Sequence, residues 1–404
     1  MCKEKQKIYL VGIGMGAESS LTLQAVEILK SCDFIIGAKR MLEAVGKFGK
    51  PVFAAYQPKQ IQSCIKLHPE YTRIAVVLSG DTGFYSGAKK LEQTLTGYET
   101  ERIPGISSAV YLAAKLHTSW EDAVLVSAHG RKQNYIHAIA HHEKTFLLLG
   151  GSEAGREFCE KIKDYGLEHV DIWIGSQLSY QEEVILHKKG GELTCEDLSG
   201  LDAALIYNAE PDRRTYRHIE DEEFIRGKVP MTKSEIRAVS LAKLGLTEDA
   251  VLYDVGAGTG SVSIEAAVQS GSMKVYAIEK NPEGVRMIRE NKKKFRCDWI
   301  EIVEGTAPEV LQGLEPPTHV FIGGSSGNLK EILACVKAKN PSVRIVLNAI
   351  SLETVKEAVE AAEEGILKDP EIVQIMASRS KKLGAYHMMT GMNPVYIITD
   401  GKEQ

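Results

Sequence analysis

Long apolar runs are missing from this sequence of 404 residues. A membrane-spanning helix needs about 20 consecutive apolar residues, and no stretch of the chain approaches that length. The opening MCKEKQKIYLVGIG has a basic tip, but its apolar segment ends at once in glycines. It therefore predicts neither a signal peptide nor a transit peptide. We expect no membrane partner and a cytoplasmic protein.

An excess of charge of one sign is also missing. The chain has 49 Lys and Arg against 54 Asp and Glu, a formal net charge of -5. Division of the chain after Arg214 leaves a small acidic excess on both sides. Because a nucleic-acid-binding domain would show a positive surplus in one part, we expect no nucleic-acid partner.

Closely spaced cysteines and metal-ligand clusters are missing as well. The seven cysteines lie far apart, without C-x-x-C spacing, at Cys2, Cys32, Cys64, Cys159, Cys195, Cys297 and Cys335. This distribution favours reduced thiols over a disulfide or zinc framework. His129 and the pair His141 and His142 have no third ligand at a useful spacing, so we expect no metal site.

The sequence does contain short β-favouring runs that alternate with helical patterns, as is typical of α/β domains. The first part predicts strands at 8–11, 34–37, 74–78, 123–127, 146–149, 171–175 and 203–207. The second part predicts strands at 251–255, 275–278, 300–303, 319–322, 344–348, 372–376 and 395–399. Helices such as 21–30 and 282–294 lie between strands. The polar segment 210–228 has almost no apolar periodicity and is interpreted as linking sequence. We therefore expect two α/β domains, 1–214 and 230–404, with a linker at 215–229.

The most informative motif is DVGAGTG in the second part. A β-favouring run reaches Asp254, glycines follow at Gly256, Gly258 and Gly260, and a helical pattern begins. Glycine permits positive φ angles and lets the backbone approach a ligand closely. The next strand ends at Glu279, about 20 residues on, where a carboxylate can bind ribose hydroxyls. Together these residues predict a nucleoside-binding βαβ unit.

The residues around this loop favour one nucleoside ligand. A dinucleotide fingerprint would have glycine where this chain has Ser261. Asp254 places beside the loop a carboxylate that would repel a pyrophosphate and attract the cationic sulfonium and amine of S-adenosylmethionine. We therefore favour a methyl donor over NAD. A tight strand-to-helix turn without a ligand stays open as the alternative.

Two later loops of the second part also follow strands. Thr306 and Ala307 come after strand 300–303, where they can flank an adenine. Gly323 comes after strand 319–322, where it can leave space for the reacting methyl group and the acceptor. Each loop taken alone can equally be a plain turn.

The glycine loops of the first part are of another kind. The first strand runs into GIGMG, but the next strand ends at Gly37 and not at an acid, so a Rossmann-type ribose contact is not expected. A later strand runs into Gly80 and Asp81, and PGISSA places Ser107 and Ser108 at the start of a helix. These side chains suit ligand contact or helix capping.

The motifs, in this order, resemble the bifunctional precorrin methyltransferase family of cobalamin biosynthesis, in which two methyltransferases of unrelated fold are fused. Residues 1–214 resemble the carbon-5 methyltransferase, of the tetrapyrrole-methylase fold with two α/β subdomains, through LVGIGMG, IIGAKRML, SGDTGFYSGA, PGISSA and WEDA…SAHGR. Residues 230–404 resemble the decarboxylating carbon-15 methyltransferase, a Rossmann-like class I methyltransferase. The matching segments there are PMTKSEIRA, DVGAGTGSVSIEAA, AIEKNP, GTAPEVL, FIGGSSG and NPVYIIT.

The resemblance implies two S-adenosylmethionine sites per chain and a homo-oligomer. In the first part, the cofactor would lie in a cleft between the two subdomains and touch Gly80, Asp81, Ser107 and Ser108. In the second part, it would lie across 256–260, with Glu279 on the ribose and Ala307 near the adenine. Thr232 and Lys233 of the M-T-K segment would cover the cofactor or meet the substrate.

The implied substrate is a precorrin or cobalt-precorrin macrocycle, methylated at ring carbons 5 and 15 and decarboxylated at the carbon-12 acetate. Because this macrocycle carries many carboxylates, each part should offer cations. The candidates are Arg131, Lys132, Lys233, Arg237, Arg379 and Lys381. Arg131 and Arg237 are favoured because arginine binds carboxylate in bidentate fashion. Arg379 and His387 are candidates for a group that assists decarboxylation, with a basic surface loop as the alternative.

Two other functions stay open. The second part could methylate RNA or another tetrapyrrole, although the lack of positive charge argues against RNA. The chain could also be an NAD-linked dehydrogenase with a regulatory first domain.

Overall fold

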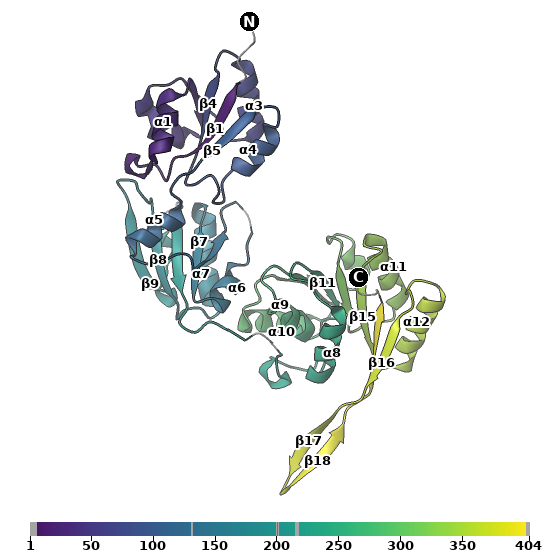
Figure 1. Cartoon of the computed structure of the whole chain (residues 1–404). Coiled ribbons are helices and arrows are strands. Elements are labelled where there is room, and N and C mark those ends of the chain that lie inside the picture. Colours follow the sequence, from purple (N-terminus) through teal and green to yellow (C-terminus); the bar gives the residue numbers. More distant parts are fainter. Residues whose placement is uncertain (1–5, 131, 199, 201, 215–217, 401–404) are drawn as a thin grey trace. The chain divides into compact units, whose positions relative to one another are not determined.

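The computed structural model describes residues 6–130, 132–198, 200, 202–214 and 218–400. These residues form two compact units (Figure 1). The first holds the chain up to Tyr135 with His142–Lys163 and Leu167–Pro211, and the second holds Ile136–His141, Asp164–Gly166 and the chain from Asp212. In the described part of the chain, no helix is long and apolar enough to cross a membrane. None of the described cysteines forms a disulfide.

The first unit begins with a parallel sheet in the order β3-β2-β4-β1-β5. Its strands are β1 (Lys7–Gly12), β2 (Phe34–Gly37), β3 (Val52–Ala54), β4 (Arg73–Leu78) and β5 (Glu99–Ile103). Its helices are α1 (Leu23–Ser31), α2 (Lys39–Val45), α3 (Pro58–Leu67) and α4 (Ala88–Thr94). Because successive strand residues point to opposite faces, Ile8 and Leu10 pack against α3 and α4, whereas Tyr9 and Val11 pack against α1 and α2.

The first unit continues with a mixed sheet in the order β6-β7-β10-β8-β9. Its strands are β6 (Val124–Ser127), β7 (Lys144–Leu148), β8 (Asp171–Ser176), β9 (Val184–Lys189) and β10 (Asp202–Tyr207). The helices of this stretch of the chain are α5 (Ser108–Lys115), α7 (Gly151–Asp164) and α6 (Tyr135–His141), of which α6 belongs, apart from Tyr135, to the second unit. Ala109 and Leu112 of α5 pack against Phe146 and Leu205 of the sheet.

The second unit contains a seven-stranded sheet in the order β13-β12-β11-β14-β15-β19-β16. Its strands are β11 (Val251–Val255), β12 (Lys274–Glu279), β13 (Ile300–Glu304), β14 (His319–Ile322), β15 (Arg344–Ala349), β16 (Glu371–Ile375) and β19 (Val395–Asp400). β19 runs antiparallel to β15 and β16, and the pairs from β13 to β15 are parallel.

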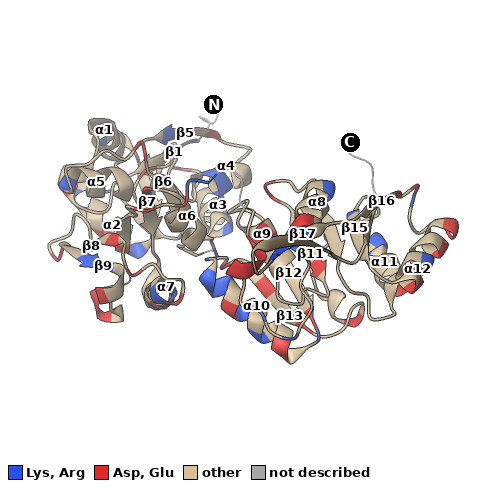
Figure 2. Ribbon diagram, turned by 90° about the horizontal axis from the view of Figure 1, so that it is seen from below, with Lys and Arg blue, Asp and Glu red and all other residues tan. Residues whose placement is uncertain are grey.

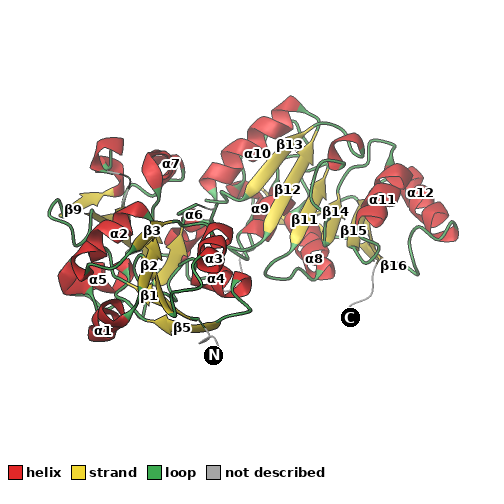
Figure 3. Ribbon diagram, turned by 90° about the horizontal axis from the view of Figure 1, so that it is seen from above, coloured by secondary structure: helices red, strands yellow, loops and turns green. Residues whose placement is uncertain are grey.

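Helices cover both faces of this sheet (Figure 3). One face packs on α8 (Ser234–Leu244), α9 (Ser261–Ala267) and α10 (Pro282–Lys294), and the other on α11 (Leu329–Lys339) and α12 (Leu352–Glu363). A hairpin of β17 (Ser378–Leu383) and β18 (Tyr386–Gly391) extends beyond the sheet (Figure 1). The short 3-10 helices are η1 (Glu18–Ser20), η2 (Gly46–Phe48), η3 (Gly190–Glu192), η4 (Cys195–Asp197), η5 (Asp221–Glu223) and η6 (Glu309–Leu311).

The predicted fold class is confirmed: two α/β subdomains precede a Rossmann-like domain. The predicted strands are all present, and the structure adds the hairpin strands β17 and β18 and, in the larger sheets, the three strands β3, β5 and β9. Each of these three is an edge strand. β3 is only three residues long, and β5 and β9 carry charged side chains, so none of the three has an apolar run as long as those by which the central strands are found.

The polar segment 210–228 is not simply solvated linking sequence. Ile219 and Phe224 lie in the core of the second unit, and Asp221 is fully buried. The buried charge of Asp221 is compensated by ion pairs with Arg237 and Arg379, which a hydrophobicity pattern cannot reveal. Over the chain as a whole, basic and acidic residues are interspersed, as along α10 (Figure 2).

Candidate active sites

The glycine loop between β11 and α9 depends on its three glycines. Gly256, Gly258 and Gly260 have φ angles of +74°, +59° and +78°, which L side chains rarely adopt. A Cβ on Gly256 would lie 2.7 Å from the carbonyl oxygen of Gly324, and one on Gly258 would collide with that of Pro230. The loop after β14 and the segment before α8 therefore both meet the backbone of the glycine loop.

Glu279 lies at the end of β12, beside the same loop. Its Oε2 accepts a hydrogen bond of 2.7 Å from the backbone N–H of Gly258, and its Oε1 accepts one of 2.8 Å from Asn281. The residue is 8% exposed. The structure thus brings the predicted ribose-binding acid and the predicted glycine loop into direct contact.

Asp254 is buried beneath the loop. Its Oδ2 accepts hydrogen bonds from the backbone N–H and the hydroxyl of Ser263, at 3.0 and 2.5 Å. Its Oδ1 has no hydrogen-bond partner among the described residues. Burial raises the pKa of this carboxyl to about 7, against the lowering effect of Ser263. A buried carboxylate with an uncompensated oxygen fits a cationic ligand such as a sulfonium.

The loops after β13 and β14 reach the same edge of the sheet. Gly305 donates a backbone hydrogen bond of 3.0 Å to Glu279, and Gly323 donates one of 2.9 Å to Val255. Ala307 is 5% exposed, and neighbouring Thr306 is partly buried. The predicted adenine and methyl loops therefore converge on the glycine loop, as the carboxyl ends of parallel strands do.

Arg237, predicted to bind a substrate carboxylate, has no exposed surface. Its Nε donates to Glu265 at 2.6 Å, and one Nη1 hydrogen bond of 2.7 Å goes to the carbonyl of Thr232. It also forms an ion pair of 3.3 Å with Asp221 and a hydrogen bond with the carbonyl of Ile219. Since every part of this guanidinium is already committed, we do not retain Arg237 as a substrate-binding residue. The residue type gives no sign of this burial, since arginine is almost never fully buried unless it is paired.

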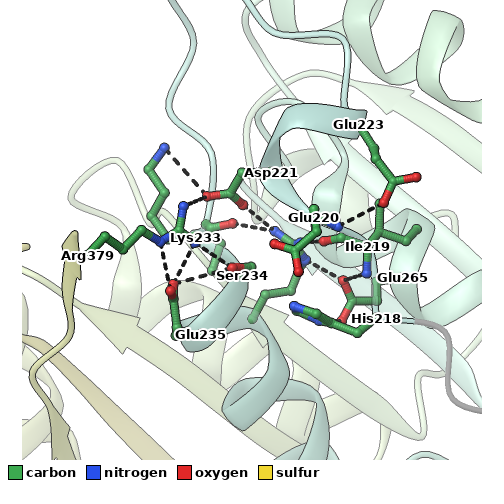
Figure 4. A network of polar contacts seen from close by, with 12 residues as sticks. His218, Ile219, Glu220, Asp221, Glu223, Lys233, Ser234, Glu235, Glu265 and Arg379 are labelled. Atoms are coloured by element: carbon green, nitrogen blue, oxygen red, sulfur yellow. Dashed lines mark hydrogen bonds and ion pairs between the residues drawn. The ribbon is translucent and has the colours of Figure 1, made fainter. Parts of the chain in front are cut away.

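Arg379 and Lys233 approach the buried Asp221 from the outside (Figure 4). Arg379 forms an ion pair of 3.1 Å with Asp221 and hydrogen bonds of 2.7 Å with both carboxylate oxygens of Glu235. This guanidinium lowers the pKa of Glu235 to about 2. The ammonium of Lys233 lies 3.9 Å from Asp221, and its side chain is 44% exposed. Of the predicted cations on α8 and before it, Lys233 is the one that can meet a ligand.

Other candidates of the second unit lie apart from this cluster. Lys381 and His387 are exposed on the β17–β18 hairpin. Thr232 contributes its carbonyl to the contact with Arg237. Within the described residues, no group of three His, Cys, Asp or Glu side chains could hold a metal ion.

The predicted residues of the first unit come together at the carboxyl ends of β1, β4 and β5. Gly14 and Gly80 exchange backbone hydrogen bonds of 3.2 and 2.6 Å. Asp81 accepts a hydrogen bond of 3.0 Å from the N–H of Gly105. Its carboxylate therefore joins the loop after β4 to the loop after β5. The hydroxyl of Ser107 accepts a hydrogen bond of 3.3 Å from the backbone N–H of Val110 and so caps α5, as the capping alternative predicts.

A cavity of about 340 Å³ lies beside these loops in the first unit, lined by Gly80 and Ser108. His129 also lines it, whereas Lys132 is exposed and does not. Arg131, the favoured cation of this unit, lies outside the described residues. The cavity is lined in addition by Arg40, which the sequence does not single out although it belongs to the IIGAKRML segment.

Comparison with known proteins extends these observations. The model of tetrapyrrole (corrin/porphyrin) methylases matches residues 7–194, and that of precorrin methyltransferase domains matches residues 223–400. The chain is 44% identical over 184 residues to a probable cobalt-precorrin-6B C(15)-methyltransferase (decarboxylating) of Pyrobaculum calidifontis, covering 45% of this chain and 94% of the relative. It is 41% identical over 189 residues to the cobalt-precorrin-6B C(15)-methyltransferase (decarboxylating) of Salmonella typhimurium, covering 46% and 97%.

A solved structure of precorrin-6y C5,15-methyltransferase from Geobacter metallireducens is 42% identical and covers 46% of this chain and 97% of that chain, with a TM-score of 0.44. Both family models describe methyltransferases, which supports S-adenosylmethionine as the methyl donor. The predicted resemblance is confirmed by the sequence relatives. With this sequence identity over nearly the full length of those relatives, the chain belongs to the family of decarboxylating cobalt-precorrin-6B C(15)-methyltransferases.

Proposed function

We propose that the chain methylates one precorrin or cobalt-precorrin macrocycle at ring carbon 5 with its first unit and at ring carbon 15 with its second. The second step is accompanied by decarboxylation of the carbon-12 acetate. Support comes from the family membership and from the two family models, which match successive parts of the chain. For the second unit, the decisive observation is the meeting of the glycine loop, Glu279 and Asp254 at one sheet edge.

We propose S-adenosylmethionine as the ligand of both units. In the second unit, the residues that fit it are Thr232, Asp254, Gly256, Gly258, Gly260, Glu279, Thr306, Ala307 and Gly323. In the first unit, they are Gly80, Asp81, Ser107 and Ser108, with Asp81 and Ser107 acting through the loop and the helix start that they hold.

When bound, S-adenosylmethionine supplies an electrophilic methyl group with a neutral leaving group. The residues of the chain then have to align the acceptor carbon, exclude water and hold the acceptor carboxylates. Lys233 is the cation of the second unit that we assign to an acceptor carboxylate, because it is exposed and only weakly held by Asp221. A chain without a global positive field has to bind a polyanion through such local cations.

We also retain the division into domains 1–214 and 230–404 with a linker at 215–229, the cytoplasmic location and the homo-oligomeric state as proposals. Light scattering on the purified chain tests the last of these. A molar mass equal to one chain would overturn it.

Calorimetry with S-adenosylhomocysteine tests the two-site assignment. We expect close to two binding sites per chain and no binding of NADH. A stoichiometry of one site per chain would show that one of the two units binds no cofactor and would overturn the two-site assignment. Binding of NADH would favour the dehydrogenase alternative. Incubation with precorrin-6B or its cobalt form and S-adenosylmethionine, followed by mass spectrometry, should show two added methyl groups and the loss of carbon dioxide.

A further inference from the structure

The cavity of the first unit combines an apolar wall with one basic side chain, and the acid of its lining, Asp202, is buried and accepts hydrogen bonds from Ser176 and Gly200. Met15, Phe84, Leu178 and Tyr180 are among the side chains that line its volume of about 340 Å³. Among the described lining residues, Arg40 is the only Lys or Arg. Such a lining fits a ligand with a hydrophobic body and an anionic rim.

Arg40 lies on the side of the cavity away from the serine loop. It belongs to α2, which follows β2, whereas Ser107 and Ser108 follow β5. The sheet order places β4 and β1 between these two strands. Because neighbouring strands lie about 4.8 Å apart, the ends of β2 and β5 are separated by roughly 14 Å. A ligand group at Arg40 is therefore distinct from one at Ser108.

The guanidinium of Arg40 is held over an aromatic ring. Its central carbon lies 5.8 Å from the ring centroid of Tyr180, which follows β8 in the other sheet of the unit. Tyr180 can approach because Gly16 has no side chain: a Cβ there would lie 2.5 Å from the Tyr180 hydroxyl. This contact joins the guanidinium to a ring and not to an acceptor atom, so it leaves N–H edges of Arg40 for an anionic ligand.

Those N–H edges have no carboxylate partner among the described residues. The ion pairs of the surrounding elements join other groups, such as Lys47 with Glu18 and Lys115 with Glu183. Glu183 also accepts a hydrogen bond of 2.7 Å from the backbone N–H of Ser179. Ser179 precedes Tyr180 and has a φ angle of +69°. Glu183, which belongs to the segment that carries Tyr180, is thus committed to holding that segment and to Lys115.

We propose that Arg40 binds a carboxylate at the rim of the macrocyclic acceptor in the first unit, and so determines which acceptor carbon faces the methyl donor. This inference rests on the proposed function of the first unit. Bidentate pairing of the guanidinium with a carboxylate would fix both the distance and the plane of the ring edge. The methyl donor would lie at the Gly80 and Ser108 side of the same cavity.

Three variants of the full chain test the assignment. Arg40→Ala should raise the KM for precorrin-6B in carbon-5 methylation about 10- to 100-fold, the range for loss of a charged hydrogen bond, with kcat within about threefold. Arg40→Lys should recover part of the loss, since it keeps the charge without the bidentate fork. Lys39→Ala is the control: it removes a positive charge from an exposed neighbour on α2 and should leave both the KM and kcat of carbon-5 methylation unchanged. Affinity for S-adenosylhomocysteine and carbon-15 methylation should be unchanged in all three.

The possible failures are distinguishable. If Arg40→Ala weakens S-adenosylhomocysteine binding and leaves the acceptor KM unchanged, Arg40 belongs to the donor carboxylate and the proposal is overturned. An unchanged KM with unchanged donor affinity overturns it as well. If the wild-type chain methylates no carbon 5, the proposed function of the first unit has failed. Equilibrium titration of the variants with precorrin-6B then still tests the contact of Arg40. We expect Arg40→Ala to lower the affinity of one class of precorrin-6B site, and Lys39→Ala to retain that affinity. Identical binding isotherms for the two variants would exclude the contact.

Discussion

Asp254 illustrates how burial sets the chemistry of a single residue. The residue is 1% exposed, and only one of its carboxyl oxygens has hydrogen-bond partners in the described residues. Desolvation penalises the ionised form, so the pKa rises to about 7. A carboxylate of this kind costs stability when it is charged and gains most from a nearby cation. Both consequences can be measured.

The first consequence is a pH-dependent stability. Because the folded-state pKa is raised, the folded protein retains a proton that the unfolded chain has lost above about pH 4, and stability falls as pH rises toward 7. In Asp254→Asn this loss is absent. The stability of the variant relative to wild type should therefore increase by about 3 kcal/mol between pH 5 and pH 8. Urea unfolding at several pH values measures this, and a difference independent of pH would show that the carboxyl is not buried as described.

The second consequence concerns activity. Asp254→Ala removes the charge beside the glycine loop and the acceptor of two hydrogen bonds from Ser263. We expect carbon-15 methylation and decarboxylation to fall at least 100-fold while carbon-5 methylation is retained. Mass spectrometry of the product should show one added methyl group and no loss of carbon dioxide. Loss of both methylations would contradict two independent sites.

At the scale of elements, the ion pairs around Asp221 join parts of the second unit that are distant in sequence. Arg237 ties the start of α8 to Glu265 of α9 and to Asp221 of η5. Arg379 ties strand β17 to Asp221 as well and to Glu235 of α8 (Figure 4). The segment between η5 and α8 includes Pro230, whose carbonyl lies against Gly258. These ion pairs therefore hold the backbone that covers the glycine loop.

Arg379→Ala tests this role. The variant leaves the buried Asp221 with one guanidinium fewer, and we expect a loss of about 1–3 kcal/mol in unfolding free energy. Arg379→Lys should recover part of it. Lys382→Ala, on the same strand and exposed, should change stability by less than about 0.5 kcal/mol. An acceptor KM that rises with no change in stability would instead show that Arg379 meets a substrate carboxylate, as the sequence predicts.

At the scale of the whole molecule, each unit contains its own set of strand-end loops. The glycine-loop residues and their partners all belong to the second unit, whereas the cavity with Gly80 and Arg40 belongs to the first. Neither set draws a residue from the other unit. Ligand binding at the two sites should therefore be separable by substitution.

Gly258→Ala is the substitution that separates them. Alanine at φ +59° costs about 1–2 kcal/mol and would also collide with the carbonyl of Pro230. We expect the stoichiometry of S-adenosylhomocysteine binding to fall from about two to about one, with the affinity of the remaining site unchanged. Gly313→Ala is the control, since a Cβ there meets nothing within 4 Å. A variant that loses both sites would refute their independence.

The sequence by itself determines the alternation of strands and helices, the glycine loop with its following acid, and the family. These features depend on local spacing and on backbone conformations that glycine adopts readily and other residues rarely do, as at Gly256 and Gly258. The tertiary structure alone decides what each charged residue does. Arg237 and Lys233 stand four positions apart in the same segment, yet one is fully buried and the other exposed. Arg40 lines a cavity because elements distant in the sequence enclose it. Burial and pairing depend on contacts between distant segments, and a one-dimensional pattern carries no information about those contacts.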